Sequence, residues 1–291
     1  MVPRTARRRR PHRAEIRRAR RRRNFVALAV AVVAVFVGIG FVVTREEATS
    51  VAPGKGALLL DESFGGTSLN ANRWSPCYHW ATDGCTNLSN DELEWYVPEQ
   101  VKVADGVLSL EADRRSVTGI DDRQFDYVSG LISGASPDAT LFAFKYGYVE
   151  SRVRLPKGQG LWSALWMLPT TRESKPEVDI FETVGERPDT VQMHTHWSDN
   201  GEDQQRGHKW HDGDMTEGWH TFGLQWEPDS LTWYVDGEVR WRVTDPDQIP
   251  HEDMYLLTNL AVGGALTKTP NADTPFPSSL KVDYIRVWGL P

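Results

Sequence analysis

The sequence from residue 58 onward predicts an all-β fold. Short runs rich in β-branched and aromatic residues, several of them alternating between apolar and polar positions, are separated by Gly, Pro, Asn and Asp. An Asp-Gly pair, Asp236 and Gly237, joins two such runs. Beyond one apolar run near the N-terminus, no long stretch has the period of a helix. Roughly 230 residues of this texture fit one β-sandwich without internal repeats.

The clearest predicted strands follow one another through this region. They occupy residues 107–112, 147–155, 221–226, 231–235 and 280–288. The run at 231–235 and the run after Gly237 predict a hairpin, because Asp-Gly accepts the positive φ that a two-residue turn needs.

The N-terminal segment differs sharply in charge from the rest of the chain. Residues 1–23 contain twelve Arg, no Lys and one Glu, a local charge of +11. Removing it from the net charge of −7 leaves −18 on the remaining residues. Residues 25–43 are uncharged, and at ~1.5 Å per residue they match the ~30 Å core of a bilayer. We therefore expect an Arg-rich cytoplasmic segment at 1–23, a transmembrane signal-anchor helix at 24–43 and a linker at 44–57.

This organisation predicts a single-pass protein of the cell membrane, with residues 58–291 outside the cell. The alternative is secretion after cleavage of a signal peptide, which usually has an apolar stretch of about 7–15 residues. The run here is longer, and Thr44, Arg45, Glu46 and Glu47 make a poor cleavage site. Nucleic acid is not an expected partner, because the arginines adjoin the span and lack interleaved aromatics.

Three carboxylates, Glu177, Asp179 and Glu182, lie in an otherwise apolar strand-like run. Burying unpaired charge in this way is costly unless chemistry uses it; the alternative is an exposed acidic edge strand. Residues i and i+2 share a face, so one bulged residue among Ile180 and Phe181 is needed to bring Glu182 to the same side. Two carboxylates about 5–5.5 Å apart are typical of a retaining glycosidase.

The surrounding motifs resemble glycoside hydrolase family 16, the family of laminarinases, lichenases, agarases and carrageenases. The resemblance spans residues 58–291. The motifs that carry it, besides 177–182, are residues 72–74, 90–96, 146–152, 157–169, 193–197, 259–264 and 282–288. It implies a jelly-roll sandwich whose concave face holds a saccharide-binding groove.

By this resemblance, Glu177 is the nucleophile, Glu182 the acid/base and Asp179 the residue that tunes the pair. The bulged spacing is similar to that of laminarinases and galactan-cleaving members, which favours β-1,3-glucan as substrate and requires no cofactor. The charge of −18 disfavours acidic polysaccharides. A neutral galactan hydrolase and a transglycosylase remain open alternatives. A non-catalytic glucan-binding receptor is disfavoured, because such relatives lack the glutamates. A monomer is expected.

Aromatic side chains provide flat platforms for sugar rings, although core packing is the commoner fate of a Trp. The resemblance implies that Trp162 lines the groove and that Trp166 lies near the site or in the core. Trp80, Trp95 and Trp197 are weaker candidates.

Four polar residues are candidates for contacts with substrate. Asn90 and Arg152 match positions that contact sugar hydroxyls in the family; each has a structural alternative, for Arg152 an ion pair with Glu150. His196 matches a family histidine and is expected to form a hydrogen bond near the carboxylates. His194 departs from the commoner residue and is either a second groove residue or a structural histidine.

Cys77 and Cys85 are the only cysteines. The export signal places them in an oxidising compartment, so a disulfide is expected, contributing about 2–3 kcal/mol by closing a short loop.

Some family members bind a structural calcium ion through an aspartate that here corresponds to Asp283. Asp61 and Glu62 offer further oxygen ligands, but the number of ligands that calcium needs is not visible in the sequence.

Overall fold

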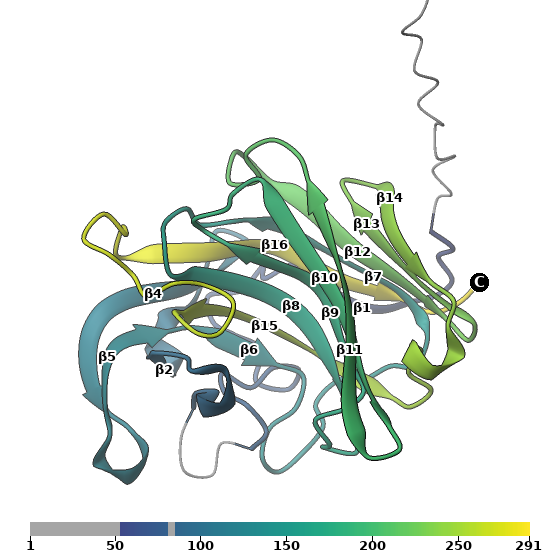
Figure 1. The fold of residues 1–291 in the computed structure, drawn as a ribbon, viewed down its shortest axis with the longest axis horizontal. Helices are drawn as coiled ribbons and strands as arrows, with labels where there is room; N and C mark the ends of the chain where they lie inside the picture. The colour runs from purple at the N-terminus through teal and green to yellow at the C-terminus, as the bar shows by residue number, and fades with distance from the viewer. Residues whose placement is uncertain (1–52, 81–84) are drawn as a thin grey trace, which may run out of the picture. The chain divides into compact units, whose positions relative to one another are not determined.

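The computed structural model describes residues 53–80 and 85–291. Two antiparallel sheets pack face to face (Figure 1). The first sheet has ten strands. Eight of them form a continuous path: β14 (Glu238–Val243), β13 (Ser230–Val235), β12 (His220–Glu227), β7 (Gly147–Arg154), β16 (Ser278–Trp288), β4 (Val107–Thr118), β5 (Gln124–Ser129) and β2 (Glu94–Tyr96). The other two, β1 (Leu58–Glu62) and β3 (Val101–Ala104), pair with β16 and β4, and only the β2–β5 pairing is parallel.

The second sheet has six strands and carries the candidate site. Its order is β11 (Glu202–His211), β10 (Thr190–Asp199), β9 (Glu177–Val184), β8 (Leu161–Pro169), β15 (Met254–Val262) and β6 (Leu131–Ser133). The described helices are short 3₁₀ turns: η1 (Leu88–Asn90), η2 (Pro98–Gln100), η3 (Ile120–Asp122) and η4 (Pro246–Gln248).

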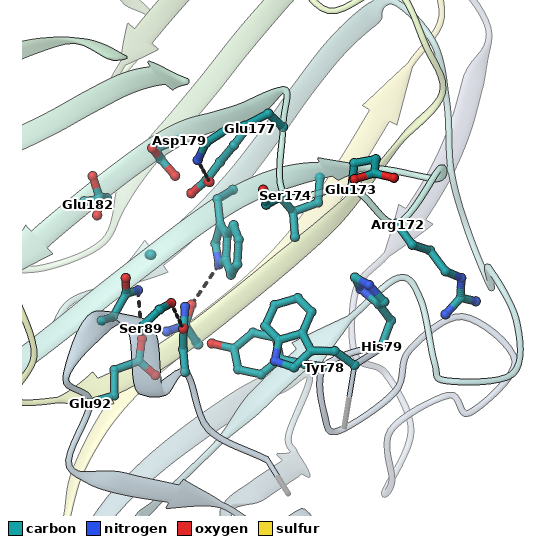
Figure 2. Close-up of a pocket in the computed structure, with 18 of the residues that line it drawn as sticks. Tyr78, His79, Ser89, Glu92, Arg172, Glu173, Ser174, Glu177, Asp179 and Glu182 are labelled. Carbon is teal, nitrogen blue, oxygen red and sulfur yellow. Dashed lines mark hydrogen bonds and ion pairs between the residues drawn. The ribbon is translucent and has the colours of Figure 1, made fainter. Parts of the chain in front are cut away.

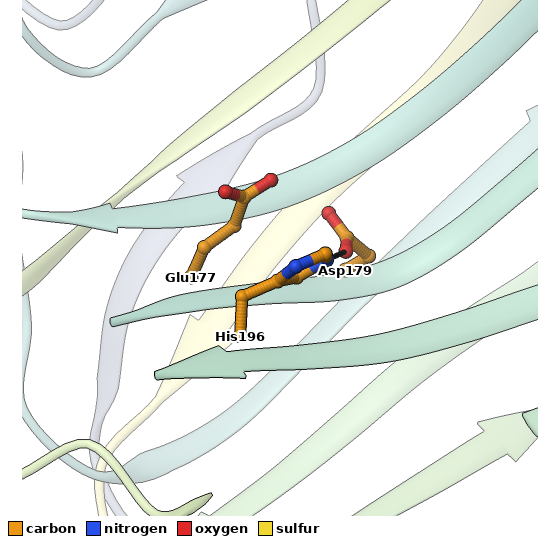
Figure 3. A group of neighbouring side chains, drawn as sticks. All are labelled: Glu177, Asp179 and His196. Atoms are coloured by element: carbon orange, nitrogen blue, oxygen red, sulfur yellow. Dashed lines mark hydrogen bonds and ion pairs between the residues drawn. The ribbon is translucent and has the colours of Figure 1, made fainter. Parts of the chain in front are cut away.

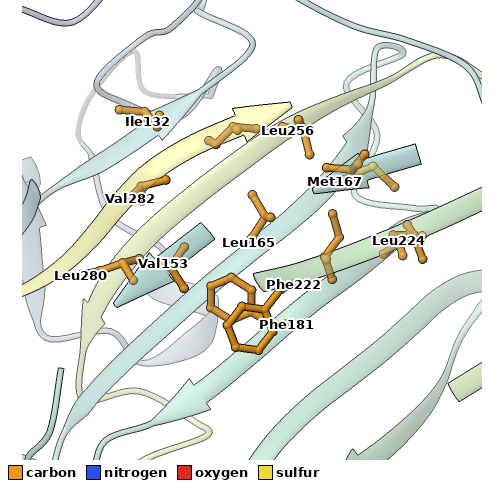
Figure 4. Packing of buried hydrophobic residues seen from close by; sticks show 14 of the residues in the cluster. Ile132, Val153, Leu165, Met167, Phe181, Phe222, Leu224, Leu256, Leu280 and Val282 are labelled. Atoms are coloured by element: carbon orange, nitrogen blue, oxygen red, sulfur yellow. The ribbon is translucent and has the colours of Figure 1, made fainter. Parts of the chain in front are cut away.

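The main hydrophobic core lies between the two sheets. Leu165 and Met167 on β8 and Phe222 and Leu224 of the ten-stranded sheet belong to one cluster of buried side chains (Figure 4). Burying each such side chain contributes roughly 1.5–3 kcal/mol. Because strand residues alternate, the intervening Trp166 points to the opposite face of the six-stranded sheet. Alternate residues of β8 therefore contribute to the core and to the opposite face of the sheet.

A second, smaller cluster covers that opposite face. Tyr78 and Tyr96, from a segment that runs over β8 and β15, pack against Trp166, Leu168 and Tyr255. The predicted disulfide between Cys77 and Cys85 is present and brackets the part of this segment that carries Tyr78. This segment forms one wall above the sheet.

The structure confirms the all-β prediction and its jelly-roll-like sandwich. All five predicted runs are strands, and at the predicted hairpin Asp236 and Gly237 have φ values of 52° and 80°. Within residues 53–80 and 85–291, no helix is long and apolar enough to cross a membrane. The predicted span at 24–43 and the arginine segment at 1–23 lie outside the described residues.

Candidate active site

A cleft of about 400 Å³ lies on the face of the six-stranded sheet that points away from the core. Figure 2 shows Glu177, Asp179 and Glu182 in a row along one strand, with Tyr78 and His79 across from them. The lining comprises Tyr78, His79, Trp80, Asn87, Ser89, Asn90, Glu92, Trp162, Ala164, Trp166, Leu168, Arg172, Glu173, Ser174, Lys175, Glu177, Asp179, Glu182 and Asn259. The cleft thus combines aromatic surfaces with converging carboxylates, the general character of a ligand site.

A bulge in β9 brings the three carboxylates to one face. Against β8, Trp166 pairs with Asp179 and Leu165 with Phe181, so Ile180 has no partner. Ile180 and Phe181 both enter the core, and Phe181 packs against Phe222. The strand resumes its alternation one residue out of phase, and Glu182 points into the cleft. The predicted bulge is confirmed.

Asp179 and Glu177 form one group with a histidine from the neighbouring strand. His196 on β10 lies 3.0 Å from an Asp179 carboxylate oxygen through Nε2, as Figure 3 shows. The Lys175 ammonium donates to Glu177 Oε2 at 3.1 Å. Asp179 is 4% exposed, whereas Glu177 is less enclosed. Cationic or protonatable partners therefore offset part of the cost of burying these acids.

Glu182 has partners on both carboxylate oxygens. The indole N–H of Trp162 donates to Oε1 at 3.1 Å, and His194 Nδ1 lies 2.6 Å from Oε2. Glu182 is 8% exposed. Its carboxyl group is consequently fixed in orientation from both sides, by an indole on β8 and an imidazole on β10.

The pKa values of Glu177 and Asp179 are both raised by their surroundings. Burial and the nearby Asp179 raise the pKa of Glu177, and the charges of His196 and Lys175 oppose this. Burial and the charge of Glu182 raise the pKa of Asp179, against the hydrogen bond from His196. Glu177 and Asp179 interact strongly enough that their two protons belong to the pair.

Metal binding is not what this geometry suggests. Two described triplets, Glu177–Asp179–His196 and Asp179–Glu182–His194, bring one polar atom each within 4.8 Å. Their shortest contacts are histidine–carboxylate hydrogen bonds, so we treat them as acid–base pairs. Neither triplet supplies the six to eight oxygens typical of calcium.

Asp283, the predicted calcium ligand, lies far from these triplets in the fold. It is on β16 and pairs with the Arg152 guanidinium at 2.7 Å. Its carboxylate therefore already has a cationic partner.

The predicted substrate role of Arg152 is wrong. Arg152 lies on β7 of the ten-stranded sheet, and its strand neighbours Val149 and Val153 point into the core. Arg152 therefore faces solvent on the side away from the cleft. Its predicted partner Glu150 instead accepts hydrogen bonds from tyrosines, so that ion pair is also wrong.

Other predicted residues do reach the cleft. Trp162, Trp166 and Asn90 line it, whereas Trp95 and Trp197 do not, which corrects the prediction for these two. His194 and His196 lie on β10, each bonded to one of the carboxylates.

Several cleft residues escaped the sequence analysis. Asn259 accepts a hydrogen bond from the Trp166 indole at 2.9 Å and donates one to the Tyr96 hydroxyl at 3.0 Å. It therefore links the six-stranded sheet to the segment that covers it. Lys175 could have been considered, since it lies only two residues before Glu177 in the sequence. Arg172, by contrast, comes from a loop whose path no local pattern specifies.

Glu92, also missed, forms a buried acid pair with Glu94. Both are almost fully buried, and burial followed by the charge of Glu94 raises the pKa of Glu92 well above its usual value. A raised folded-state pKa contributes stability that is complete below the unfolded pKa and lost as pH rises through the folded value. Glu92→Gln cannot ionise, so its stability should fall less as pH rises. We expect its melting temperature at about pH 8 to exceed that of the wild type.

Thermal unfolding at about pH 5 and pH 8 checks this expectation. Glu99→Gln, at an exposed position seven residues away in the chain, is the matched control and should leave the pH dependence unchanged. An identical pH dependence in Glu92→Gln and the wild type would show that the acid pair holds no proton in the folded state.

Comparison with known proteins places these features in a family. The model of glycosyl hydrolases family 16 matches residues 89–286. Over 228 residues the chain is 34% identical to endo-1,3-1,4-beta-glycanase EglC of Rhizobium meliloti, covering 75% of this chain and 48% of EglC. It is 33% identical over 263 residues to glucan endo-1,3-beta-glucosidase A1 of Niallia circulans, covering 79% and 37% of the two chains. The chain thus spans about half or less of the length of these curated relatives.

The fold has a close counterpart among solved structures. The endo-beta-1,3-glucanase from Pyrococcus furiosus superposes with a TM-score of 0.69 at 30% sequence identity. The alignment covers 83% of this chain and 99% of that one.

Proposed function

The chain belongs to family 16 of the glycosyl hydrolases, and from this membership and the cleft geometry we propose that it is a retaining, endo-acting hydrolase of β-glucan. The observation that carries the proposal is the bulged strand β9, which presents Glu177, Asp179 and Glu182 to one cleft. Fold alone would not support a reaction, but these side chains supply a nucleophile and an acid/base in one row.

In the first step, Glu177 is the nucleophile. Lys175 holds Oε2, which leaves Oε1, without a hydrogen bond from the described residues, as the oxygen to attack the anomeric carbon. The bond from that carbon to the leaving oxygen breaks as Glu182 gives that oxygen a proton. The products are a glycosyl ester on Glu177 and a shortened glucan chain with a free hydroxyl.

In the second step, Glu182 is a base. It takes a proton from water, whose oxygen attacks the anomeric carbon and releases Glu177 as a carboxylate. Two inversions give net retention. Asp179, between the two glutamates, tunes their proton affinities through its charge and its bond to His196. No step requires a cofactor.

We favour β-1,3-glucan as the substrate. The named relatives are 1,3- and 1,3-1,4-β-glucan enzymes, and the bulged spacing matches the laminarinase-like form. The charge of −18 outside the N-terminal segment suits a neutral polymer. Transfer of the glycosyl group to a sugar instead of water uses the same first step and is the second candidate.

Product analysis with the full-length chain tests the proposal. Laminarin, mixed-linkage glucan and agarose are incubated separately, and reducing ends and the first anomer released are followed. Early β-anomeric oligosaccharides from laminarin are expected, with or without a chelator. Cleavage of agarose alone would redirect the substrate to galactan, longer products would indicate transglycosylation, and binding without cleavage would contradict an enzyme.

Trp80 is the exposed aromatic platform of the cleft. It is 39% exposed and stacks on Tyr78 with ring centroids 4.2 Å apart. Stacking on a sugar face contributes about 0.5–1.5 kcal/mol, so Trp80→Ala should raise KM about 2- to 10-fold with little change in kcat. Trp80→Phe should recover much of the loss, and Trp95→Phe, outside the cleft, should have no effect. A fall in kcat at constant KM would contradict a binding role.

We propose that the enzyme is anchored in the cell membrane by residues 24–43. The proposal rests on the length of the uncharged run and the arginines before it. N-terminal sequencing of the mature protein tests the anchor, because a start near residue 50 would show cleavage and secretion instead.

A further inference from the structure

His194 lies unusually close to the proposed acid/base. Its Nδ1 is 2.6 Å from Glu182 Oε2, a shorter contact than the 3.0 Å between His196 and Asp179. Glu182 Oε1 accepts from the Trp162 indole, which can only donate. The proton in the contact with His194, by contrast, can reside on either partner.

The neighbouring strand makes room for this imidazole. Gly207 on β11 lies opposite His194, and a Cβ there would be 2.2 Å from His194 Cδ2 and 2.5 Å from Nε2. Contacts that short require the ring to move. Any side chain at position 207 would therefore displace the imidazole that now reaches Glu182.

We propose that His194 is a positioning residue that shares one transferable proton with Glu182, and that Gly207 is required for this arrangement. The proposal rests on the function proposed above and deepens it. The pair, rather than Glu182 alone, supplies the acid of the first step and receives the proton of the second.

The proton balance closes over one turnover. The pair begins with one proton between Nδ1 and Oε2 and gives it to the leaving oxygen through Glu182. The glycosyl-enzyme then contains a Glu182 carboxylate beside a neutral His194, whose remaining ring proton is on Nε2. Glu182 takes a proton from the attacking water, which restores the shared proton.

The charged groups around His194 favour its protonated form, so the proton shared with Glu182 is retained to higher pH. Glu182 and Asp179 face His194 from β9, His196 lies beside it on β10, and Lys209 shares its face on β11. Burial alone would lower the pKa of His194, but the hydrogen bond and the charge of Glu182 outweigh it, so the pKa is raised above 6.5. The like charge of His196 opposes this rise in the pKa of His194.

Two measurements on the full-length chain test the proposal. Histidine-selective NMR follows the titration of His194, whose signal is identified as the one missing in His194→Gln. Glu182→Gln should lower the midpoint of the His194 titration. In both His194→Gln and Gly207→Ala, the alkaline limb of the pH profile of kcat/KM on laminarin should shift to lower pH by about 1–2 pH units. The reason is that a glutamate without the histidine partner loses its proton at lower pH. Activity at acidic pH should persist.

Matched controls lie on or beside β11. His208→Gln changes a histidine that stacks on Trp241 instead of meeting a carboxylate, and Gly213→Ala adds a methyl group where no atom lies within 4 Å. Neither should move the profile.

An alkaline limb that stays in place in His194→Gln would overturn the proposal. Should His194→Gln be inactive at every pH, an aryl glucoside with an activated leaving group decides the matter. Recovery of the burst of aryl alcohol shows that the acid step had failed, as proposed, and no recovery shows a purely structural role. A wild type that leaves glucan intact would refute the proposed function, while the NMR titration would still report on the shared proton.

Discussion

Glu177→Gln is expected to reduce the turnover of laminarin by about 10⁴-fold or more, because the amide cannot form the glycosyl-enzyme. Gln has nearly the same shape as Glu, and Lys175 Nζ, 3.1 Å from Oε2, can still donate to its carbonyl oxygen. The substitution therefore removes the nucleophile and its charge with little loss of packing. Initial rates of reducing-end release measure the effect.

The fold should survive this substitution. Glu177 is raised in pKa by burial and by Asp179, so losing one of two crowded charges should leave the melting temperature unchanged or higher. Glu202→Gln, on an exposed end of β11, is the control and should keep full activity. Turnover near that of the wild type in Glu177→Gln would contradict the assignment of Glu177 as the nucleophile.

The products formed with an added nucleophile identify the role more directly. In Glu177→Ala, azide can occupy the vacated space and attack an activated aryl glycoside from the same side. One inversion then gives an α-glycosyl azide, and no second inversion follows. The anomeric configuration, read by NMR, distinguishes a missing nucleophile from a collapsed site.

Much of the site could be predicted because strand alternation is a local property. Glu177 and Asp179 are two residues apart, and the single bulge at Ile180 brings Glu182 to the same face, as the antiparallel pairing of β9 with β8 shows. The Asp236-Gly237 turn is equally local, since the positive φ is a property of those two residues.

The failures have a common physical origin in long-range pairing. Alternation correctly placed Arg152 and Glu150 on one face of β7, but it cannot say which sheet β7 joins. That depends on pairing with β12 and β16, which are far away in sequence. Asp283 becomes the partner of Arg152 for the same reason.

Positions that depend on a loop or on a neighbouring strand could not be predicted from local sequence either. Trp80, only a weaker candidate in the sequence, lines the cleft because it stacks on Tyr78 within a segment closed by Cys77 and Cys85, a placement that local sequence does not specify. Gly207 has no positive φ or turn to mark it. Its role emerges only when His194 is seen on the adjacent strand.

Glu182→Ala is expected to have the second large effect, and the effect should depend on the leaving group. With laminarin, loss of the proton donor should lower kcat/KM by about 10²–10⁴-fold. An aryl glycoside whose leaving group needs no proton should still acylate Glu177 at close to the wild-type rate. The ratio of the two losses, measured on the same enzyme, isolates the acid step.

The second half of the reaction gives the complementary evidence. Without Glu182 no base activates water, so the glycosyl-enzyme should accumulate and appear as a burst of aryl alcohol followed by slow turnover. Azide needs no base and should release the sugar as a β-glycosyl azide, the product of two inversions, whereas Glu177→Ala should give the α-product. If Glu182 were the nucleophile and Glu177 the acid/base, the two variants would exchange their azide products. The anomer formed by each variant therefore assigns the two glutamates independently of how much activity either one retains.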